Sequence, residues 1–458
     1  MRYFSTRDKN LNFSFKDIFL RGLAPDGGLF IPSELKRYND KEIKDLSKLS
    51  YVDLATEIIS NFCKSDLDKT RLKLLLEKSY KVFNHPEVVN IKKIGKINIL
   101  ELYNGPTLAF KDIAMQVIGN MYEELNISEE KVINIVVATS GDTGSAAIAA
   151  LNKRKNINVF VLHPNNKISN IQRRIMTTID SNNVFNLAIK GTFDDCQKIV
   201  KDMFSDNKFR EKINMSGVNS INWARIVCQI VYYFYTALKF HNKSLNFSVP
   251  TGNFGDVYSG YIAKKMGLPI DKLIVATNEN DILRRVINFG EYKPSEVKPS
   301  LSPSMDIQVS SNFERLLFDI VDQDDKKVAS LMARLQSKGF FSLDKEEVKK
   351  VKENFSAEKV GDKETLEIIK SFEDKHNFIL DPHTATAVVA SSRVKNSSDN
   401  IILGTAHPYK FLETIKKATG KEIKPPKQLA NIIDKKEKYD ILENNVLDVK
   451  NFILGKVI

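Results

Sequence analysis

Cysteine is scarce in this chain of 458 residues, and its spacing carries no metal or disulfide signature. The three cysteines, Cys63, Cys196 and Cys228, lie far apart, are odd in number and form no CxxC pair. A disulfide framework or a zinc site needs paired or closely spaced ligands, so the sequence predicts neither and favours a reducing compartment. The six histidines show no HxxxH or HExxH spacing either, and no metal site is predicted.

Long apolar runs are also missing. The most apolar stretch, residues 226–238, spans 13 residues and contains Gln229, whereas a membrane helix needs about 20 apolar residues. Charged residues near the start, among them Arg2 and Arg7, stand where a signal peptide needs an apolar segment. We therefore expect a cytoplasmic protein without a membrane partner.

Basic residues exceed acidic ones by 12, with 69 Lys and Arg against 57 Asp and Glu. The lysines are scattered among Asn, Asp and Glu instead of clustering, so we interpret the excess as a solvated surface and predict no nucleic-acid partner. With 42% hydrophobic and 28% charged residues, the chain has the composition of a folded globular protein.

The length predicts more than one hydrophobic core, and the patterning suggests three regions. Residues 1–90 form a small, mostly helical leading domain, with helical spacing over residues 51–62 and 67–82. Residues 91–424 form a catalytic region of two α/β subdomains, and residues 425–458 form a tail that packs back through an apolar piece at 446–454.

The central region alternates Val- and Ile-rich runs with turn residues and amphipathic stretches, as in parallel sheets covered by helices. The clearest helix covers residues 222–239. The predicted strands are residues 132–138, 158–162, 184–189, 246–249, 273–276 and 401–403. In such α/β folds ligands bind beyond the carboxyl ends of the strands, so the loops after the strands deserve the closest reading.

Three segments of this kind carry chemistry. The loop Thr139–Ser145 (TSGDTGS) suits an anion such as a carboxylate, because glycines, hydroxyls and a helix N-terminus meet there, although it also fits an ordinary helix cap. The loop Pro250–Asp256 (PTGNFGD) suits a phosphate or is a structural turn, and it matches neither GxGxxG nor GK[ST]. Lys111, in the segment GPTLAFKD, is either a buried reactive amine or a solvated surface lysine. A serine hydrolase is disfavoured because no GxSxG elbow is present.

Taken together, a reactive lysine, a carboxylate loop and a phosphate cradle are what a pyridoxal phosphate enzyme requires. These three segments, with TAHPYKF at 405–411, resemble threonine synthase in the order expected of that family. The opening residues 22–32, NSINWAR at 219–225 and DPHTA at 381–385 extend the resemblance nearly end to end. Tyr409 departs from the pattern, since alanine is more usual there.

The resemblance implies a fold type II pyridoxal phosphate enzyme, a carbon–oxygen lyase that makes L-threonine and phosphate from O-phospho-L-homoserine. It places the Schiff base on Lys111 and the ring nitrogen of the cofactor on Thr405. It places the cofactor phosphate on Gly252, Asn253, Phe254, Gly255 and Asp256. The substrate carboxylate would lie on Ser140, Asp142, Thr143 and neighbouring N–H groups. For the substrate phosphate, Arg225 is the first candidate and Lys410 the second, because guanidinium recognises phosphate in a fork.

Two other interpretations remain open on the sequence. A phospho-lyase or dehydratase of the same fold would eliminate phosphate and release a 2-keto acid. A protein that binds pyridoxal phosphate or nucleic acid without catalysis is favoured only by the net charge. We expect a monomer or a weak homodimer.

Overall fold

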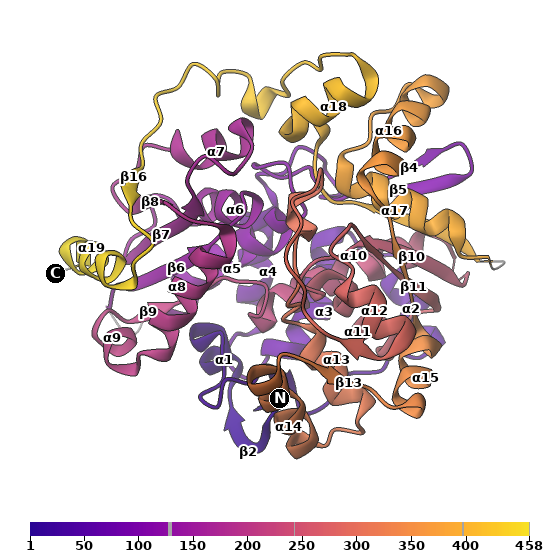
Figure 1. Ribbon diagram of the computed structural model, residues 1–458. Coiled ribbons are helices and arrows are strands. Elements are labelled where there is room, and N and C mark those ends of the chain that lie inside the picture. Colours follow the sequence, from indigo (N-terminus) through magenta and orange to yellow (C-terminus); the bar gives the residue numbers. More distant parts are fainter. Residues whose placement is uncertain (127–130, 242, 396–397, 458) are drawn as a thin grey trace.

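Two parallel sheets form the framework of the computed structural model, which describes residues 1–126, 131–241, 243–395 and 398–457. The larger sheet has the strand order β14 (Phe355–Lys359), β11 (Ile270–Thr277), β10 (Leu245–Pro250), β15 (Asp399–Gly404), β5 (Ile97–Glu101) and β4 (Asn90–Ile94). Only β4 runs antiparallel to its neighbour, because it pairs with β5 as a hairpin. The smaller sheet, at the left of Figure 1, is parallel throughout, with the order β16 (Asp440–Leu442), β8 (Val184–Ile189), β7 (Ile157–Pro164), β6 (Ile133–Ala138) and β9 (Met215–Ser216).

Helices cover both faces of the larger sheet, which explains why its strands are apolar on both sides. In the register, Phe247 of β10 lies opposite Leu273 of β11 and Ile401 of β15. One face packs against α17 (Pro382–Arg393). On the other face, α10 (Trp223–Lys239) packs against α3 (Tyr51–Cys63), α5 (Lys111–Asn126) and α11 (Gly255–Lys265). Every residue of α10 except the last is buried.

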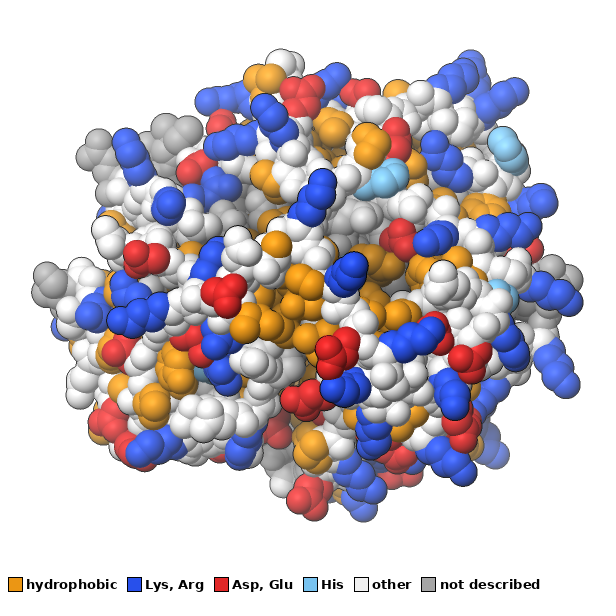
Figure 2. Space-filling view, turned by 90° about the horizontal axis from the view of Figure 1, so that it is seen from above, with side chains coloured by type: hydrophobic (Ala, Val, Ile, Leu, Met, Phe, Trp, Pro, Cys, Tyr) orange, Lys and Arg blue, Asp and Glu red, His pale blue; other side chains and the backbone are white. Residues whose placement is uncertain are grey.

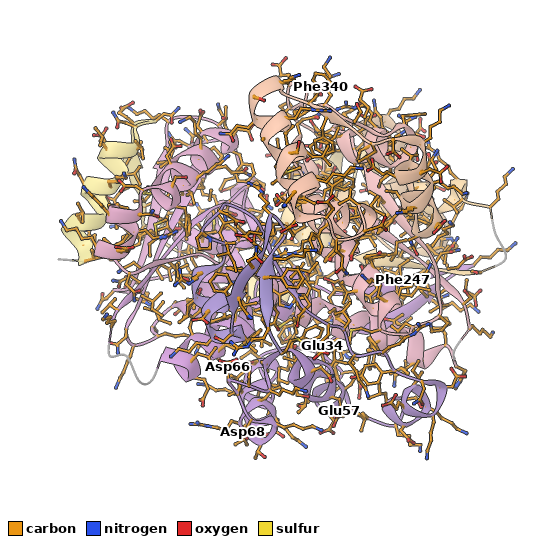
Figure 3. The ribbon with its side chains drawn as sticks, turned by 90° about the horizontal axis from the view of Figure 1, so that it is seen from below. Glu34, Glu57, Asp66, Asp68, Phe247 and Phe340 are labelled. Atoms are coloured by element: carbon orange, nitrogen blue, oxygen red, sulfur yellow. The ribbon has the colours of Figure 1, made fainter. Side chains whose placement is uncertain are left out.

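The N-terminal region joins the main core. A small antiparallel sheet, β2 (Asp8–Phe13), β1 (Tyr3–Ser5) and β3 (Phe30–Pro32), lies beside four helices: α1 (Phe15–Arg21), α2 (Asp40–Leu46), α3 (Tyr51–Cys63) and α4 (Lys69–Tyr80). The ring of Tyr3 lies 6.5 Å from that of Trp223, centroid to centroid, so β1 reaches the first turn of α10. Seen from below, these elements lie in front of the sheets, where Glu57, Asp66 and Asp68 are labelled (Figure 3).

The remaining elements cover the sheets and connect them. The C-terminal segment crosses from α18 (Leu412–Thr419) to the smaller sheet, where it adds β16 and the helix α19 (Val446–Val457) (Figure 1). Val449 and Ile453 of α19 are buried in one cluster with Ile199 and Met203 of α8 (Phe193–Ser205). The other helices and short strands are α5 (Lys111–Asn126), α6 (Asp142–Leu151), α7 (Asn170–Thr177), α8 (Phe193–Ser205), α9 (Asn207–Lys212), α11 (Gly255–Lys265), α12 (Ile282–Phe289), β12 (Glu291–Tyr292), α13 (Phe313–Ile320), α14 (Asp325–Lys338), β13 (Phe341–Ser342), α15 (Lys345–Asn354), α16 (Asp362–His376), α18 (Leu412–Thr419), α19 (Val446–Val457) and the 3-10 turns η1 (Pro303–Met305), η2 (Pro408–Phe411) and η3 (Lys427–Leu429).

The face seen from above carries lysine, arginine, aspartate and glutamate in mixture, with hydrophobic side chains gathered across its middle (Figure 2). Within the described ranges, no helix combines the length and apolarity needed to cross a bilayer. The six predicted strands and the long predicted helix are all present, with ends shifted by at most three residues.

Candidate active site

Lys111 is the first residue of α5 and lies almost entirely inside the protein, with 9% of its surface exposed. Its Nζ lies 3.2 Å from the Asp142 carboxylate and 5.1 Å from the centre of the Phe110 ring. Burial lowers the pKa of the Lys111 amine; Asp142 opposes this effect, and the nearby cations Lys410 and Arg225 reinforce it. A lysine with a lowered pKa is more readily present as the neutral amine that acts as a nucleophile or base.

The loop before Lys111 is fixed by its own hydrogen bonds. The Asp112 carboxylate accepts the backbone N–H of Thr107 at 2.8 Å and its hydroxyl at 2.6 Å. Leu108 adopts a left-handed φ of +59°, which costs a non-glycine residue about 1–2 kcal/mol. The hydrogen bonds to Asp112 hold the loop in this conformation, and the loop in turn orients Lys111.

Asp142 begins α6, at the carboxyl end of β6, and joins two lysines. Besides Lys111, it accepts from Lys410 Nζ at 2.6 Å and from Gln172 Nε2 at 3.0 Å. Burial raises the pKa of Asp142, but the charges of Lys111 and Lys410 outweigh it and hold the pKa well below 3.8. Ser140 and Thr143, in the same loop, are half-buried. The loop is closed by Thr139, whose hydroxyl accepts the N–H groups of Gly141 and Gly144, both at 2.9 Å.

The loop after β10 leads into the N-terminus of α11. Phe254 has φ +63° and α11 starts at the next residue, so the first-turn N–H groups of Gly255 and Asp256 have no acceptor within the helix. Such N–H groups, with the positive end of the helix dipole, suit a phosphate. Gly252 is required by packing, because a Cβ there would lie 2.6 Å from the carbonyl oxygen of Ser304.

The side chain of Asp256 turns away from this loop toward α10. One carboxylate oxygen accepts the hydroxyls of Tyr232 at 2.5 Å and Tyr233 at 2.9 Å, while the other, Oδ2, has no partner among the described residues. Burial raises the pKa of Asp256 to about 6. Within the predicted phosphate loop, Asp256 therefore offers its backbone N–H, and its carboxylate belongs to a network with α10.

Arg225 lies in the first turn of α10 and is 3% exposed. Its Nη1 donates to the Val218 carbonyl at 3.2 Å, and its Nε has no partner among the described residues. Burial lowers the pKa of Arg225 to about 10, which Asp256 opposes. A buried guanidinium with an unused donor is suited to an anionic ligand.

Thr405 follows β15 and connects the lysine loop to α17. Its carbonyl accepts the N–H of Phe110 at 2.9 Å, and its own N–H donates to the Thr384 hydroxyl at 3.3 Å. Beside it, His383 Nδ1 lies 3.0 Å from the N-cap carboxylate Asp381.

A segment that the sequence analysis did not single out, residues 300–312, lies over the phosphate loop; we call it the strap. Ser304 donates its hydroxyl to Asp142 at 3.4 Å and its N–H to His383 at 3.3 Å. Ser310 donates to the Gly252 carbonyl at 2.7 Å, and Asn312 donates to the Asn253 carbonyl at 2.9 Å. The strap shows no helical or strand-like apolar period, and the signal that the sequence offers is its five serines in thirteen residues.

Among the predicted residues, the structure brings Asp142, Lys410 and Arg225 close to Lys111. The donors present fit pyridoxal phosphate: a buried amine for its aldehyde, first-turn N–H groups for its phosphate, and a threonine next to the lysine loop. No group of three or more potential metal ligands occurs in the described part of the chain. The fold and this site define a pyridoxal phosphate-dependent enzyme, and the family model "Pyridoxal-phosphate dependent enzyme" matches residues 92–402.

The flanking regions narrow the class further. The models "Threonine synthase N terminus" and "Threonine synthase, C-terminal" match residues 2–80 and 384–453. The chain belongs to the threonine synthase family.

Relatives with this description align over nearly the whole chain. The threonine synthase of Pseudomonas aeruginosa is 43% identical over 459 residues, covering 99% of this chain and 98% of that protein. The threonine synthase of Saccharomyces cerevisiae is also 43% identical, covering 91% and 88%. A structure described as pyridoxal phosphate-bound threonine synthase from Brucella melitensis superimposes with a TM-score of 0.95 at 41% identity, covering 100% and 99%.

Proposed function

We propose that this protein converts O-phospho-L-homoserine and water to L-threonine and phosphate, the last step of threonine biosynthesis. Membership of the family and full-length similarity to threonine synthases support the assignment. The observation that carries it is the buried cation Arg225, whose Nε has no partner among the described residues. A substrate with its own phosphate needs such a cation in addition to the N–H groups that hold the cofactor.

In this proposal Lys111 attaches the cofactor and then, as a free amine, moves protons at the α, β and γ carbons of the substrate. The bound cofactor supplies an electron sink for these proton transfers. The γ carbon–oxygen bond breaks as phosphate leaves, and the oxygen of water bonds to the β carbon. Atoms balance without an oxidant or a reductant.

The other residues bind and orient. Gly252, Asn253, Phe254, Gly255 and Asp256 would hold the cofactor phosphate through backbone N–H groups, and Thr405 would hydrogen-bond to the ring nitrogen. Ser140, Thr143 and the N–H groups of the α6 N-terminus would bind the substrate carboxylate. Asp142 shapes that loop; as an anion it repels a carboxylate unless Lys111 and Lys410 neutralise it. Arg225, with Lys410 as the second candidate, would bind the substrate phosphate.

Product analysis tests the reaction. The purified protein with pyridoxal phosphate should release threonine and phosphate in equal amounts from O-phospho-L-homoserine. Phosphate with 2-oxobutanoate would instead identify a phospho-lyase, and no product would overturn the substrate assignment. Lys111→Ala should lose turnover and the visible absorbance of the bound cofactor, whereas Lys416→Ala, at an exposed position in α18, should keep both.

We also propose that the protein acts in the cytoplasm as a monomer or weak homodimer, without a nucleic-acid or membrane partner. The mixed charges of the surface support this proposal (Figure 2). Light scattering across a concentration series tests the assembly. The division at residues 90 and 424 stays a proposal, to be tested by limited proteolysis.

A further inference from the structure

Three buried charges of alternating sign lie in a row at the site, contributed by elements that are far apart in the sequence. Lys111 at the start of α5 and Lys410 in η2 both donate to Asp142 in the first turn of α6, at 3.2 Å and 2.6 Å. The side chains of Lys111, Asp142 and Lys410 are 11%, 4% and 0% exposed. One carboxylate thus forms ion pairs with two lysines whose side chains are almost entirely buried.

Lys410 is held at both ends. Its Nζ also donates to the Thr107 carbonyl at 3.0 Å, in the loop that precedes Lys111, and its own carbonyl accepts from Ser169 at 3.1 Å. An ammonium has three donors, and two of them are used within the protein. Its partners therefore fix Lys410 relative to Asp142 and to the loop that aims Lys111.

The second lysine matters because Lys111 must lose its positive charge in order to react. To form a bond with the cofactor or take a proton, Lys111 must be a neutral amine. If Asp142 had only Lys111 as its partner, deprotonation would leave a buried carboxylate without a counter-charge, and the ion pair would hold the proton in place. With Lys410 present, Asp142 stays paired when Lys111 becomes neutral.

We propose that Lys410 is a positioning residue that acts through Asp142: it is the permanent counter-charge of that carboxylate and lets Lys111 work as a neutral amine. The inference rests on the proposed function for the role of Lys111 as the reacting amine. It gives Lys410 a task other than binding the substrate phosphate.

The pKa of Lys111 is shifted downward, in the direction that this role of Lys410 requires. Burial lowers it first, Asp142 raises it, and the like charge of Lys410 lowers it again. The charged or titratable groups that act on this pair come from five elements besides α5: Asp142, Lys410, Arg225, Asp256 and His383. Among the other charged groups of the described residues, only Lys410 forms an ion pair with the carboxylate that Lys111 uses.

The test measures the protonation of Lys111 itself. Full-length protein freed of cofactor is labelled with trace acetic anhydride across a pH series, and mass spectrometry of the peptide containing Lys111 gives the midpoint of its reactivity. In Lys410→Met the midpoint should rise by about one pH unit, because a like charge is lost and Asp142 pairs with Lys111 alone. In Lys410→Arg it should stay near the wild-type value. Lys416→Met, at an exposed position in α18, is the matched control and should not move.

A second variant tests the carboxylate of Asp142. Asp142→Asn removes the carboxylate and leaves two like charges, so the midpoint of Lys111 should fall instead of rising. Opposite shifts in the two variants support the proposal. Where Lys410→Met does not fold, Lys410→Gln, which keeps a donor for the Thr107 carbonyl, takes its place, because a fall in Asp142→Asn alone reports only on the pair of Lys111 and Asp142. An unchanged Lys111 midpoint in the folded variants would overturn it.

Steady-state kinetics separates this role from phosphate binding. On O-phospho-L-homoserine, Lys410→Met should shift the acidic limb of kcat to higher pH in step with the labelling midpoint, because kcat reports the enzyme with substrate bound, in which Lys111 is a free amine. A rise in KM of tenfold or more with an unmoved midpoint would show that Lys410 binds substrate and would overturn the inference. Because labelling needs no turnover, it reports on the charge row even if the substrate assignment fails.

Discussion

Two buried arginines allow a sharp test of the site, because they share burial and pKa but differ in their partners. Burial lowers the pKa of Arg225 and of Arg315 to about 10. The Arg315 side chain donates to the carbonyls of Phe30 and Ile221 and to the Asn312 side chain. Among the described residues, the Arg225 side chain donates to the Val218 carbonyl alone. We predict that replacing Arg225 mainly lowers catalytic activity, whereas replacing Arg315 mainly lowers the stability of the fold.

The magnitudes follow from the contacts. A pKa lowered from 12.5 to about 10 means that keeping either charge buried costs about 3 kcal/mol, at about 1.4 kcal/mol per unit. Replacement by Met relieves this cost equally in both variants. Each acceptor left without its donor costs about 1–3 kcal/mol, so the two additional acceptors of Arg315 should make Arg315→Met less stable than Arg225→Met by about 2–6 kcal/mol.

Urea unfolding of the cofactor-free protein measures the stability difference, and cofactor-free protein is needed because bound ligand stabilises the native state. For catalysis, losing one charge-assisted contact of about 1.5–3 kcal/mol should lower kcat/KM on O-phospho-L-homoserine about 10- to 150-fold in Arg225→Met. The reasoning is refuted if Arg225→Met is as unstable as Arg315→Met, or if it keeps its kcat/KM.

Two further predictions concern Asp256 and Tyr409. Burial raises the pKa of Asp256 from 3.8 to about 6, so ionisation of this carboxyl lowers the free energy of unfolding by about 2 kcal/mol between pH 4 and pH 7. The stability of Asp256→Asn relative to wild type should rise by that amount over the same range, and a flat difference in urea unfolding would contradict it. The side chain of Tyr409 is buried in a cluster with Leu108, Ile175 and Leu429. Tyr409→Ala should therefore lower the free energy of unfolding by about 3–5 kcal/mol, and Tyr409→Phe by less than about 1.5 kcal/mol. Equal melting temperatures of the two variants would contradict this packing.

The strands that the sequence predicts are those that are buried on both faces of a sheet. The strands β6, β7, β8, β10, β11 and β15 are apolar runs because helices or neighbouring elements cover both their faces. Most of the strands that the sequence does not predict lie at sheet edges or are very short: β4 reads NIKKI, β14 reads FSAEK and β16 has three residues. The exception is β5, an interior strand that reads INILE and is also not among the predicted strands. Edge strands carry charges that protect them from other chains, and those charges hide the alternation.

The site was predictable only in part, for a geometric reason. Lys111 could be expected to point inward because its neighbours are apolar, and the loops after β6 and β10 could be read from their glycines. The ion pair of Asp142 with Lys410 joins the start of α6 to η2. These residues are far apart in the sequence, and no local sequence pattern indicates that they are in contact. Asp256 was assigned to the phosphate loop as a whole, and only the structure shows its carboxylate turned to Tyr232 and Tyr233.

The position of β16 has a consequence for biosynthesis. Residues 440–442 form the outer strand next to β8, so while the ribosome has yet to release them the smaller sheet presents β8 as an open edge. Unpaired N–H and carbonyl groups along such a strand invite pairing with another nascent chain. A stop codon shortly before residue 440 would therefore spare every residue assigned to the site and still yield a protein prone to self-association in the cell.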